Sequence, residues 1–173
     1  MRDLAFIICL TLSFQGKGLE LNYDKSKNQT TASTSSIEIK LKENYVTKTF
    51  DFKIQYAFAG ERLIQRPENA NIVFRALSHR WRFLEESNRQ AVLFMDGERF
   101  SLSSKPTYTS VIGEKFLEET LIYEIRISDI EKLAKAPNIE IQIGGVEGIV
   151  REKQLARIKD FLSALQDSNV RKN

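Results

Sequence analysis

The sequence has almost none of the residues that build disulfides and transition-metal sites. Its 173 residues include one cysteine, Cys9, and one histidine, His79. A single cysteine excludes a disulfide within the chain, and zinc or copper sites of the usual kind need more histidine or cysteine ligands than are present. Calcium requires clustered oxygen ligands, and no Asp-x-Asp-x-Asp loop occurs. We therefore predict neither a metal site nor a cofactor.

Sequence motifs for catalysis are missing as well. His79 is the one side chain suited to proton transfer near neutral pH, but no Gly-x-Ser-x-Gly elbow supplies a nucleophile. The adjacent pairs Glu85-Glu86 and Glu118-Glu119 cannot share a metal ion, because neighbouring residues of a strand face opposite sides, and they are predicted to be solvated charges. We predict no catalytic residues. The alternative is a small extracytoplasmic hydrolase or glycan-processing enzyme whose carboxylates come from separate strands.

An excess of one charge sign and long apolar runs are also absent. The formal net charge is +3, and acidic and basic residues are interspersed without a basic block. That pattern gives no electrostatic reason to expect nucleic-acid binding. Beyond residue 18 no apolar run approaches the about 20 residues of a membrane-spanning helix. We predict no transmembrane helix in the mature chain.

The first 18 residues resemble a secretory signal peptide. Arg2 precedes the apolar run from Leu4 to Phe14, and the small residues Gly16 and Gly18 follow it. The pattern predicts cleavage before Leu19 and an extracytoplasmic protein, either secreted or periplasmic. The alternatives are a buried N-terminal strand of the folded domain and an uncleaved segment.

Composition divides the rest of the chain. Residues 22–36 contain one aromatic and no branched aliphatic side chain, which leaves little apolar surface to offset the entropy of ordering. We therefore expect a flexible polar linker over 19–36. A single β-rich domain is predicted for 37–166, followed by a disordered tail over 167–173.

Period-two alternation of apolar and polar residues dominates the domain. Alternation over 37–41 and 50–58 predicts half-buried strands, and further strands are expected over 72–77, 91–95, 108–112 and 116–127. The strand over 72–77 is expected to continue through Trp81 and Phe83. Asp96-Gly97 predicts a two-residue hairpin turn.

Helical patterns occur only near the end. Ser128 and Glu131 form a capping box that predicts a short helix ending before Pro137. Strands are expected over 139–143 and 146–150, joined by a turn at Gly144-Gly145. Apolar residues at 155, 158, 162 and 165 predict an amphipathic C-terminal helix. The fold class is therefore mostly β: an antiparallel β-sandwich or curled sheet with a short helix, a hairpin and that C-terminal helix.

The densest group of cationic and aromatic residues contains the candidate binding site. The group comprises Arg75, His79, Arg80, Arg82 and Arg89 with Trp81 and Phe83. The candidate binding residues within it are Arg75, His79, Arg80, Trp81 and Arg82. Arginine planes beside aromatic rings suit anionic or carbohydrate ligands through stacking and paired hydrogen bonds. The competing interpretation is a core-facing Trp81 with solvated arginines. We predict an exported, non-enzymatic binding domain, acting at surfaces or in the envelope, whose partner is a protein or glycan. Edge strands permit dimerisation, but nothing in the pattern selects it.

Overall fold

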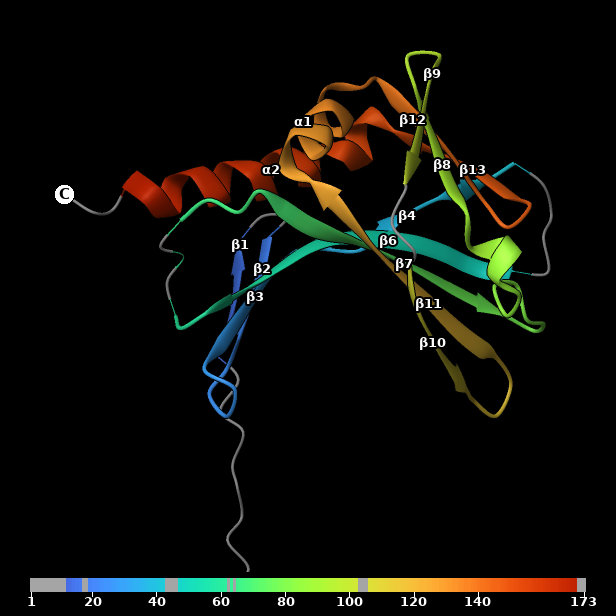
Figure 1. Ribbon diagram of the computed structural model, residues 1–173, viewed down its shortest axis with the longest axis horizontal. Helices are drawn as coiled ribbons and strands as arrows, with labels where there is room; N and C mark the ends of the chain where they lie inside the picture. The colour runs from blue at the N-terminus through green and yellow to red at the C-terminus, as the bar shows by residue number, and fades with distance from the viewer. Residues whose placement is uncertain are drawn as a thin grey trace, which may run out of the picture.

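In the residues that the structure describes, the chain forms two antiparallel sheets and two α-helices (Figure 1). The computed structural model describes residues 12–16, 19–42, 47–61, 63, 65–102 and 106–170. The larger sheet, sheet A, contains in spatial order β1 (Leu12–Gly16), β2 (Leu19–Asp24), β3 (Gln29–Thr34), β6 (Thr47–Ala59), β7 (Asn69–Ser78), β11 (Leu117–Arg126) and β10 (Thr107–Ile112), with β4 (Ile37–Glu38) beside β6. The mostly β, antiparallel fold predicted from the sequence is confirmed.

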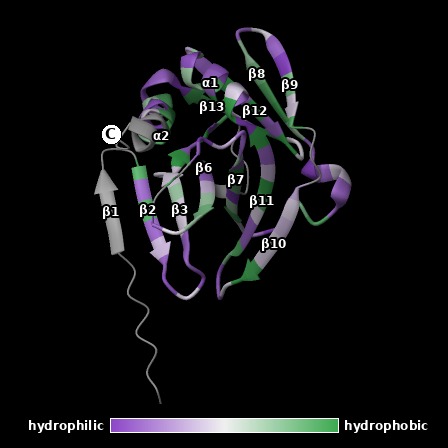
Figure 2. Ribbon diagram, turned by 60° about the vertical axis from the view of Figure 1, so that its left-hand side comes forward, coloured by the Kyte–Doolittle hydropathy of each residue, from purple (hydrophilic) through white to green (hydrophobic). Residues whose placement is uncertain are grey.

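The smaller sheet, sheet B, lies with the helices against one end of sheet A. It contains in spatial order β5 (Lys40–Leu41), β13 (Val146–Arg151), β12 (Asn138–Ile143), β8 (Ala91–Met95) and β9 (Glu98–Leu102). The helices are α1 (Ile127–Lys135) and α2 (Glu152–Val170), with a short 3₁₀ helix at Glu86–Arg89. Figure 2 shows the strands of sheet A side by side from β2 to β10, with the helices and sheet B above them.

Strand β6 shows how the sequence pattern becomes the core. Its alternation places Phe50, Phe52 and Ile54 on the inner face of sheet A, where none is more than 1% exposed. Phe74 of β7 lies beside them, with ring centroids 6.0 Å from Phe50 and 5.6 Å from Phe52. One continuous buried cluster joins this face to the inner face of sheet B and to the apolar stripe of α2. The predicted alternation of β6 is confirmed.

The chain passes from sheet A to sheet B at a single residue, Ile39. Ile37 belongs to β4 in sheet A, and Lys40 begins β5 in sheet B. Ile39 is buried and packs directly against Gly148 of β13. A Cβ atom at position 148 would lie 2.3 Å from the Cγ2 atom of Ile39, so this close crossing requires glycine.

The predicted hairpins are confirmed in both turns. Asp96 and Gly97 join β8 to β9 with φ angles of 50° and 80°. Gly144 and Gly145 join β12 to β13 with φ angles of 55° and 77°. Positive φ at both central residues is the conformation that two-residue turns between twisted strands require.

The region 19–36, predicted to be a flexible polar linker, is structured. It supplies β2 and β3, and on β3 the inner-face residues Thr30, Ala32 and Thr34 are at most 4% exposed. The prediction from polar composition was wrong because the threonine hydroxyls form hydrogen bonds inside the sheet. The Thr30 hydroxyl donates to the carbonyl of Gly60 at 2.5 Å, and the Thr34 hydroxyl accepts the Ile54 N–H at 3.1 Å.

The predictions for the two ends of the chain, a signal peptide and a disordered tail, have different outcomes. Of the expected signal peptide, residues 12–16 form β1, which pairs with β2 at the rim of sheet A. Residues 1–11, 17 and 18 lie outside the described residues, so export remains a prediction. At the other end, α2 continues to Val170, into the tail expected to be disordered from 167. Residues 171–173 lie outside the described residues.

Two local predictions were wrong. The helix α1 begins at Ile127 with Arg126 as its N-cap, and no side chain caps it, so Ser128 does not form the predicted capping box. Strand β7 ends at Ser78 and does not continue through Trp81 and Phe83. The second difference creates the surface loop described next.

Candidate functional site

The chain leaves sheet A after β7 in an exposed loop. We call residues 79–85 the Trp81 loop. At its start, the Ser78 hydroxyl donates to the backbone carbonyl of Arg80 at 2.5 Å, which bends the chain away from the strand direction. Because hydrogen bonding to β11 stops at Ser78, the side chains that follow no longer alternate between the two faces of the sheet.

A buried carboxylate holds the Trp81 loop against sheet A. Glu119 of β11 accepts the backbone N–H of Arg82 at 2.7 Å and that of Phe83 at 2.9 Å. The hydroxyl of Tyr108, on β10, donates to the same carboxylate at 3.1 Å. The Glu119 side chain is completely buried, and these three donors carry no formal charge. Burying a carboxylate without partners is costly, so this set of hydrogen bonds determines where the loop can lie.

Arg89 forms a second anchor for the same loop. Its guanidinium donates from Nε to the carbonyl of Phe83 at 2.7 Å and from Nη2 to that of Leu84 at 2.6 Å. The guanidinium carbon also lies 4.1 Å from the centre of the Tyr108 ring, a cation–π geometry. The backbone carbonyl of Arg89 accepts the Tyr123 hydroxyl. Burial raises the pKa of Tyr123, which keeps this hydroxyl a donor over the physiological range.

These anchors leave apolar side chains facing solvent. In the part of the chain that the structure describes, the large hydrophobic side chains that remain exposed are Trp81, Leu84, Val111 and Ile112. Trp81 is 39% exposed and Leu84 is 54% exposed, although their neighbour Phe83 is only 1% exposed. The Trp81 loop is thus fixed through its backbone while presenting two large apolar groups.

The predicted binding residues do not all lie together. Arg75 is on the outer face of sheet A, where its Nη2 atom lies 3.1 Å from a carboxylate oxygen of Asp51. His79 is at the start of the Trp81 loop, with its ring centroid 4.6 Å from that of Phe116 and its Nδ1 atom 3.1 Å from the carbonyl oxygen of Lys115. The structure therefore separates Arg75 from the group and places His79 at its margin.

Arg80, Trp81 and Arg82 remain together on the Trp81 loop. Arg80 is exposed. Arg82 is half-buried, and its backbone N–H donates a hydrogen bond to the Glu119 carboxylate. The interpretation of Trp81 as a core-facing residue was wrong, because Phe83 occupies the core position instead. Strand alternation had placed both aromatic residues on one face, but it does not apply beyond Ser78.

Sequence reasoning missed Glu119, which was expected to be solvated. Only its neighbour Glu118 lies on the outer face, while Glu119 is in phase with the inner-face residues Leu121 and Tyr123. That phase was a usable signal, because an acidic residue in an apolar alternation marks either an end of burial or a buried hydrogen-bond acceptor. The exposed pair Glu85-Glu86 agrees with the expectation of surface charges.

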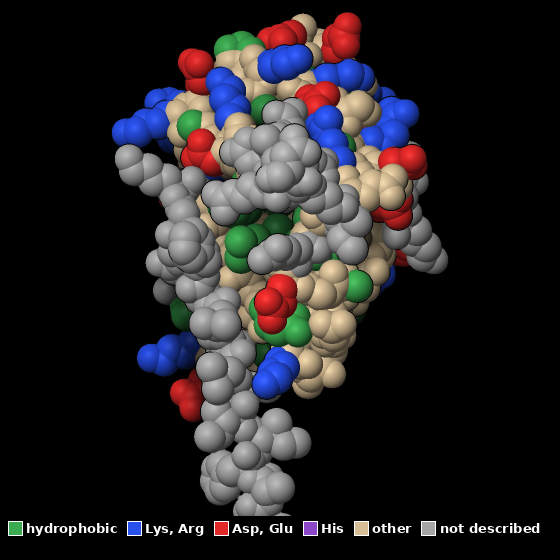
Figure 3. Space-filling view, turned by 90° about the vertical axis from the view of Figure 1, so that its left-hand side faces the viewer, with side chains coloured by type: hydrophobic (Ala, Val, Ile, Leu, Met, Phe, Trp, Pro, Cys, Tyr) green, Lys and Arg blue, Asp and Glu red, His purple; other side chains and the backbone are tan. Residues whose placement is uncertain are grey.

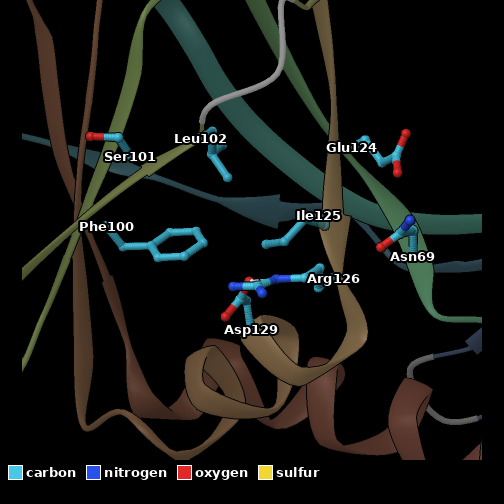
Figure 4. A pocket seen from close by; sticks show the side chains of 8 residues that line it. All are labelled: Asn69, Phe100, Ser101, Leu102, Glu124, Ile125, Arg126 and Asp129. Carbon is cyan, nitrogen blue, oxygen red and sulfur yellow. Dashed lines mark hydrogen bonds and ion pairs between the residues drawn. The ribbon is translucent and has the colours of Figure 1, made fainter.

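A separate cavity of about 460 Å³ lies between β9, β11 and α1. Figure 4 shows Phe100, Leu102 and Ile125 forming its apolar side. At its lower edge, the Nε atom of Arg126 lies 2.8 Å from a carboxylate oxygen of Asp129. The volume is within the range of small-molecule sites, which begins at roughly 300 Å³.

The acidic residues of this cavity do not converge. Glu124 and Asp129 point to opposite sides of β11 in Figure 4, and Asp129 is already paired with Arg126 and Lys132. A glycosidase needs two carboxyl groups facing one another across a cleft, roughly 5 to 10 Å apart. The cavity therefore gives no support to the carboxylate-enzyme alternative.

The remaining surface offers few other candidates. Lysine and arginine are interspersed with aspartate and glutamate on the face shown in Figure 3. The described residues contain no cluster of histidine, cysteine, aspartate or glutamate able to hold a metal ion. No helix in the described part of the chain is long and apolar enough to cross a membrane. Comparison of the sequence and structure with protein-family models, curated proteins and solved structures finds no match.

Proposed function

We propose that this protein is an exported, non-enzymatic binding domain that contacts a protein partner through the Trp81 loop. One observation carries the proposal: Trp81 and Leu84 are exposed on a loop whose backbone is fixed by Glu119 and Arg89. A loop held in one conformation loses little entropy on binding, and a tryptophan beside an aliphatic group is a typical anchor of protein interfaces. Leu84 favours a protein over a glycan because it offers no hydrogen bonds to sugar hydroxyls.

The charged residues of the loop add specificity to this apolar contact. Arg80 is exposed beside Trp81, and its planar guanidinium suits a carboxylate or a second aromatic ring on the partner. Glu85 is exposed at the other end of the loop. Charges at the rim of an interface contribute mainly to orientation and to the rate of association.

The binding test compares two double variants that remove equal numbers of exposed hydrophobic residues. Trp81→Ala with Leu84→Ala removes the proposed contact, while the control, Val111→Ala with Ile112→Ala, removes the other two large hydrophobic side chains that are exposed in the described part of the chain. Each protein is used to capture partners from an envelope extract, and the captured partner is then titrated. We expect the first variant to weaken binding by about 30-fold or more, as a loss of about 2 kcal/mol implies. The control should retain binding.

Two results would contradict this proposal. Equal capture by both variants, with unchanged circular dichroism, would remove the Trp81 loop as the contact. Capture of a polysaccharide in place of a protein would identify a glycan-binding domain.

Export has its own test, N-terminal sequencing of the protein from its native source. Strand β1 is the terminal strand of sheet A, so cleavage after Gly18 would leave β2 as the edge and keep the paired strands beyond it. We expect Leu19 at the N-terminus. An intact Met1 would contradict the exported form of the proposal.

A further inference from the structure

The strand β10 forms an exposed edge of sheet A. It is the terminal strand on its side, and within the described residues β11 is the one strand that pairs with it. Figure 1 shows the hairpin of β10 and β11 projecting away from the helices. Every residue of β10 except Tyr108 is exposed, and Val111 and Ile112 reach 63% and 74% exposure.

This edge lacks the features that usually prevent strands from pairing with other chains. Proteins protect edges with charged side chains, proline, bulges or very short strands. Strand β10 reads Thr-Tyr-Thr-Ser-Val-Ile, without a charge or a proline, and its register with β11 has no irregularity. By contrast, the edge strand β9 of sheet B carries Glu98 and Arg99, and the opposite edge strand β5 is two residues long.

We propose that two copies of this protein pair through β10, antiparallel, about a twofold axis at Ser110. The pairing joins two copies of sheet A into one continuous sheet. It goes beyond the proposed function, because it uses the strand edge and does not require the Trp81 loop.

The hairpin geometry identifies which backbone groups are available. The N–H of Gly113 donates to the carbonyl of Phe116 at 2.8 Å, so these two residues form a hydrogen-bonded pair of the antiparallel ladder. Such pairs alternate along two antiparallel strands. Residues 107, 109 and 111 therefore bond to β11, and the N–H and C=O groups of Tyr108, Ser110 and Ile112 point outward from the sheet.

A twofold axis at Ser110 uses all of these outward groups. Ser110 pairs with Ser110 of the partner subunit, and Tyr108 pairs with Ile112 of the partner subunit. Each hydrogen-bonded pair exchanges two bonds, so the three pairs contribute about six hydrogen bonds. On the outer face, Thr109 lies opposite Val111 of the partner subunit, and paired β-branched side chains of this kind stabilise sheets. Both exposed hydrophobic residues of β10 are covered.

Charge favours a second copy as the occupant. Every pair of facing residues in this register is uncharged, so the like-charge repulsion that opposes most self-paired strands is absent. The nearest acidic residue, Glu119 of β11, lies opposite Ser110, where its buried carboxylate is already bonded to the Tyr108 hydroxyl and to the N–H groups of Arg82 and Phe83. The two copies of β11 would be three strand spacings apart, about 14 Å, which exceeds the screening length of about 8 Å at physiological salt.

The first test removes one outward N–H group. Ser110→Pro deletes it while leaving the bonds to β11 intact, and Ser110→Ala is the matched control because it loses the same hydroxyl and keeps the N–H. Sedimentation of the full chain should show a concentration-dependent dimer for the wild type and for Ser110→Ala, and a monomer for Ser110→Pro. Ser110→Lys, which places two like charges opposite each other without altering the backbone, should also be monomeric.

The second test locates the axis by cross-linking. Hydrogen-bonded antiparallel pairs have Cα atoms about 5.5 Å apart, within the range of disulfides. In a Cys9→Ser background, Ser110→Cys should form a disulfide-linked dimer under mild oxidation, whereas Ser101→Cys, on the edge strand β9, should not.

Two outcomes overturn the proposal. One is a wild-type chain that remains monomeric at all concentrations. The other is a dimer that Ser110→Pro and Ser110→Lys leave unchanged. Neither result bears on Trp81 and Leu84, which lie outside β10. The control of the binding test, Val111→Ala with Ile112→Ala, does alter β10, so capture is compared below the concentration at which the wild type dimerises, and the two proposals then fail separately.

Discussion

Glu119 and Asp129 are the buried acidic side chains in the described part of the chain, and they are stabilised in different ways. Glu119 accepts hydrogen bonds from neutral donors on two other segments, at Arg82, Phe83 and Tyr108. Asp129 is paired with the cationic side chains of Arg126 and Lys132, each three residues away along the chain. The Glu119 carboxylate connects the Trp81 loop to sheet A, whereas the Asp129 carboxylate forms ion pairs within the first turns of α1.

The difference between these partners predicts how much stability the protein loses when each carboxylate is removed. Loss of a long-range acceptor leaves donors on distant segments unsatisfied and frees the Trp81 loop. Loss of a local charge pair costs little, because the partner side chains of Asp129 are mostly exposed, at 70% for Arg126 and 65% for Lys132. Three variants test this comparison.

The largest effect is expected for Glu119→Ala. It leaves the N–H groups of Arg82 and Phe83 and the Tyr108 hydroxyl without their acceptor, so the free energy of unfolding should fall by about 3 kcal/mol or more. Urea unfolding followed by Trp81 fluorescence measures this, because Trp81 is the one tryptophan of the chain. Glu118→Ala is the matched control on the outer face and should change stability by about 0.5 kcal/mol or less. Equal losses in the two variants would contradict the assigned role of Glu119.

A smaller effect is expected for Asp129→Asn. The substitution keeps an acceptor of similar shape and removes the charge, so the free energy of unfolding should fall by about 1 kcal/mol, and less in high salt. Asp160→Asn, at an exposed position of α2, is the control and should have little effect at either salt concentration. If Asp129→Asn lowered the free energy of unfolding as much as Glu119→Ala does, the proposed difference between the two carboxylates would be contradicted.

The smallest effect is expected for Tyr123→Phe, which removes the hydrogen bond to the Arg89 carbonyl. At neutral pH the free energy of unfolding should fall by about 0.5 kcal/mol. Burial raises the pKa of Tyr123, so the folded state holds this proton more tightly than the unfolded chain does. The stability that this provides is present below the unfolded pKa of about 10 and is lost as pH rises above it. The gap between wild type and variant should therefore shrink above about pH 10, and a constant gap would contradict this.

Strand alternation allowed much of the fold to be predicted. The strands over β6, β8 and β11, the two positive-φ turns and the apolar stripe of α2 all follow from residue spacing. The same reasoning failed for β2 and β3, because polar composition does not reveal that threonine hydroxyls will find acceptors and donors across a sheet. It also failed beyond Ser78, where the strand ends.

The candidate site was predictable in part. The sequence pointed to the cluster of Arg80, Trp81 and Arg82, which does lie on an exposed loop. The competing interpretation placed Trp81 in the core. Arg89 was counted in the cationic and aromatic group without being a candidate binding residue, and Glu119 was left out altogether. No local pattern connects Glu119 to the loop that it holds, since it is separated from Phe83 by 36 positions.

The sequence by itself determined the class of this protein, a mostly β antiparallel fold, because period-two spacing is a property of the chain alone. Only the tertiary structure decided which of two adjacent glutamates is buried, which aromatic residue of the Trp81 loop fills the core, and which strand edge is left open. Those outcomes depend on what each side chain meets across the fold, and alternation specifies the faces of a strand without specifying its neighbours.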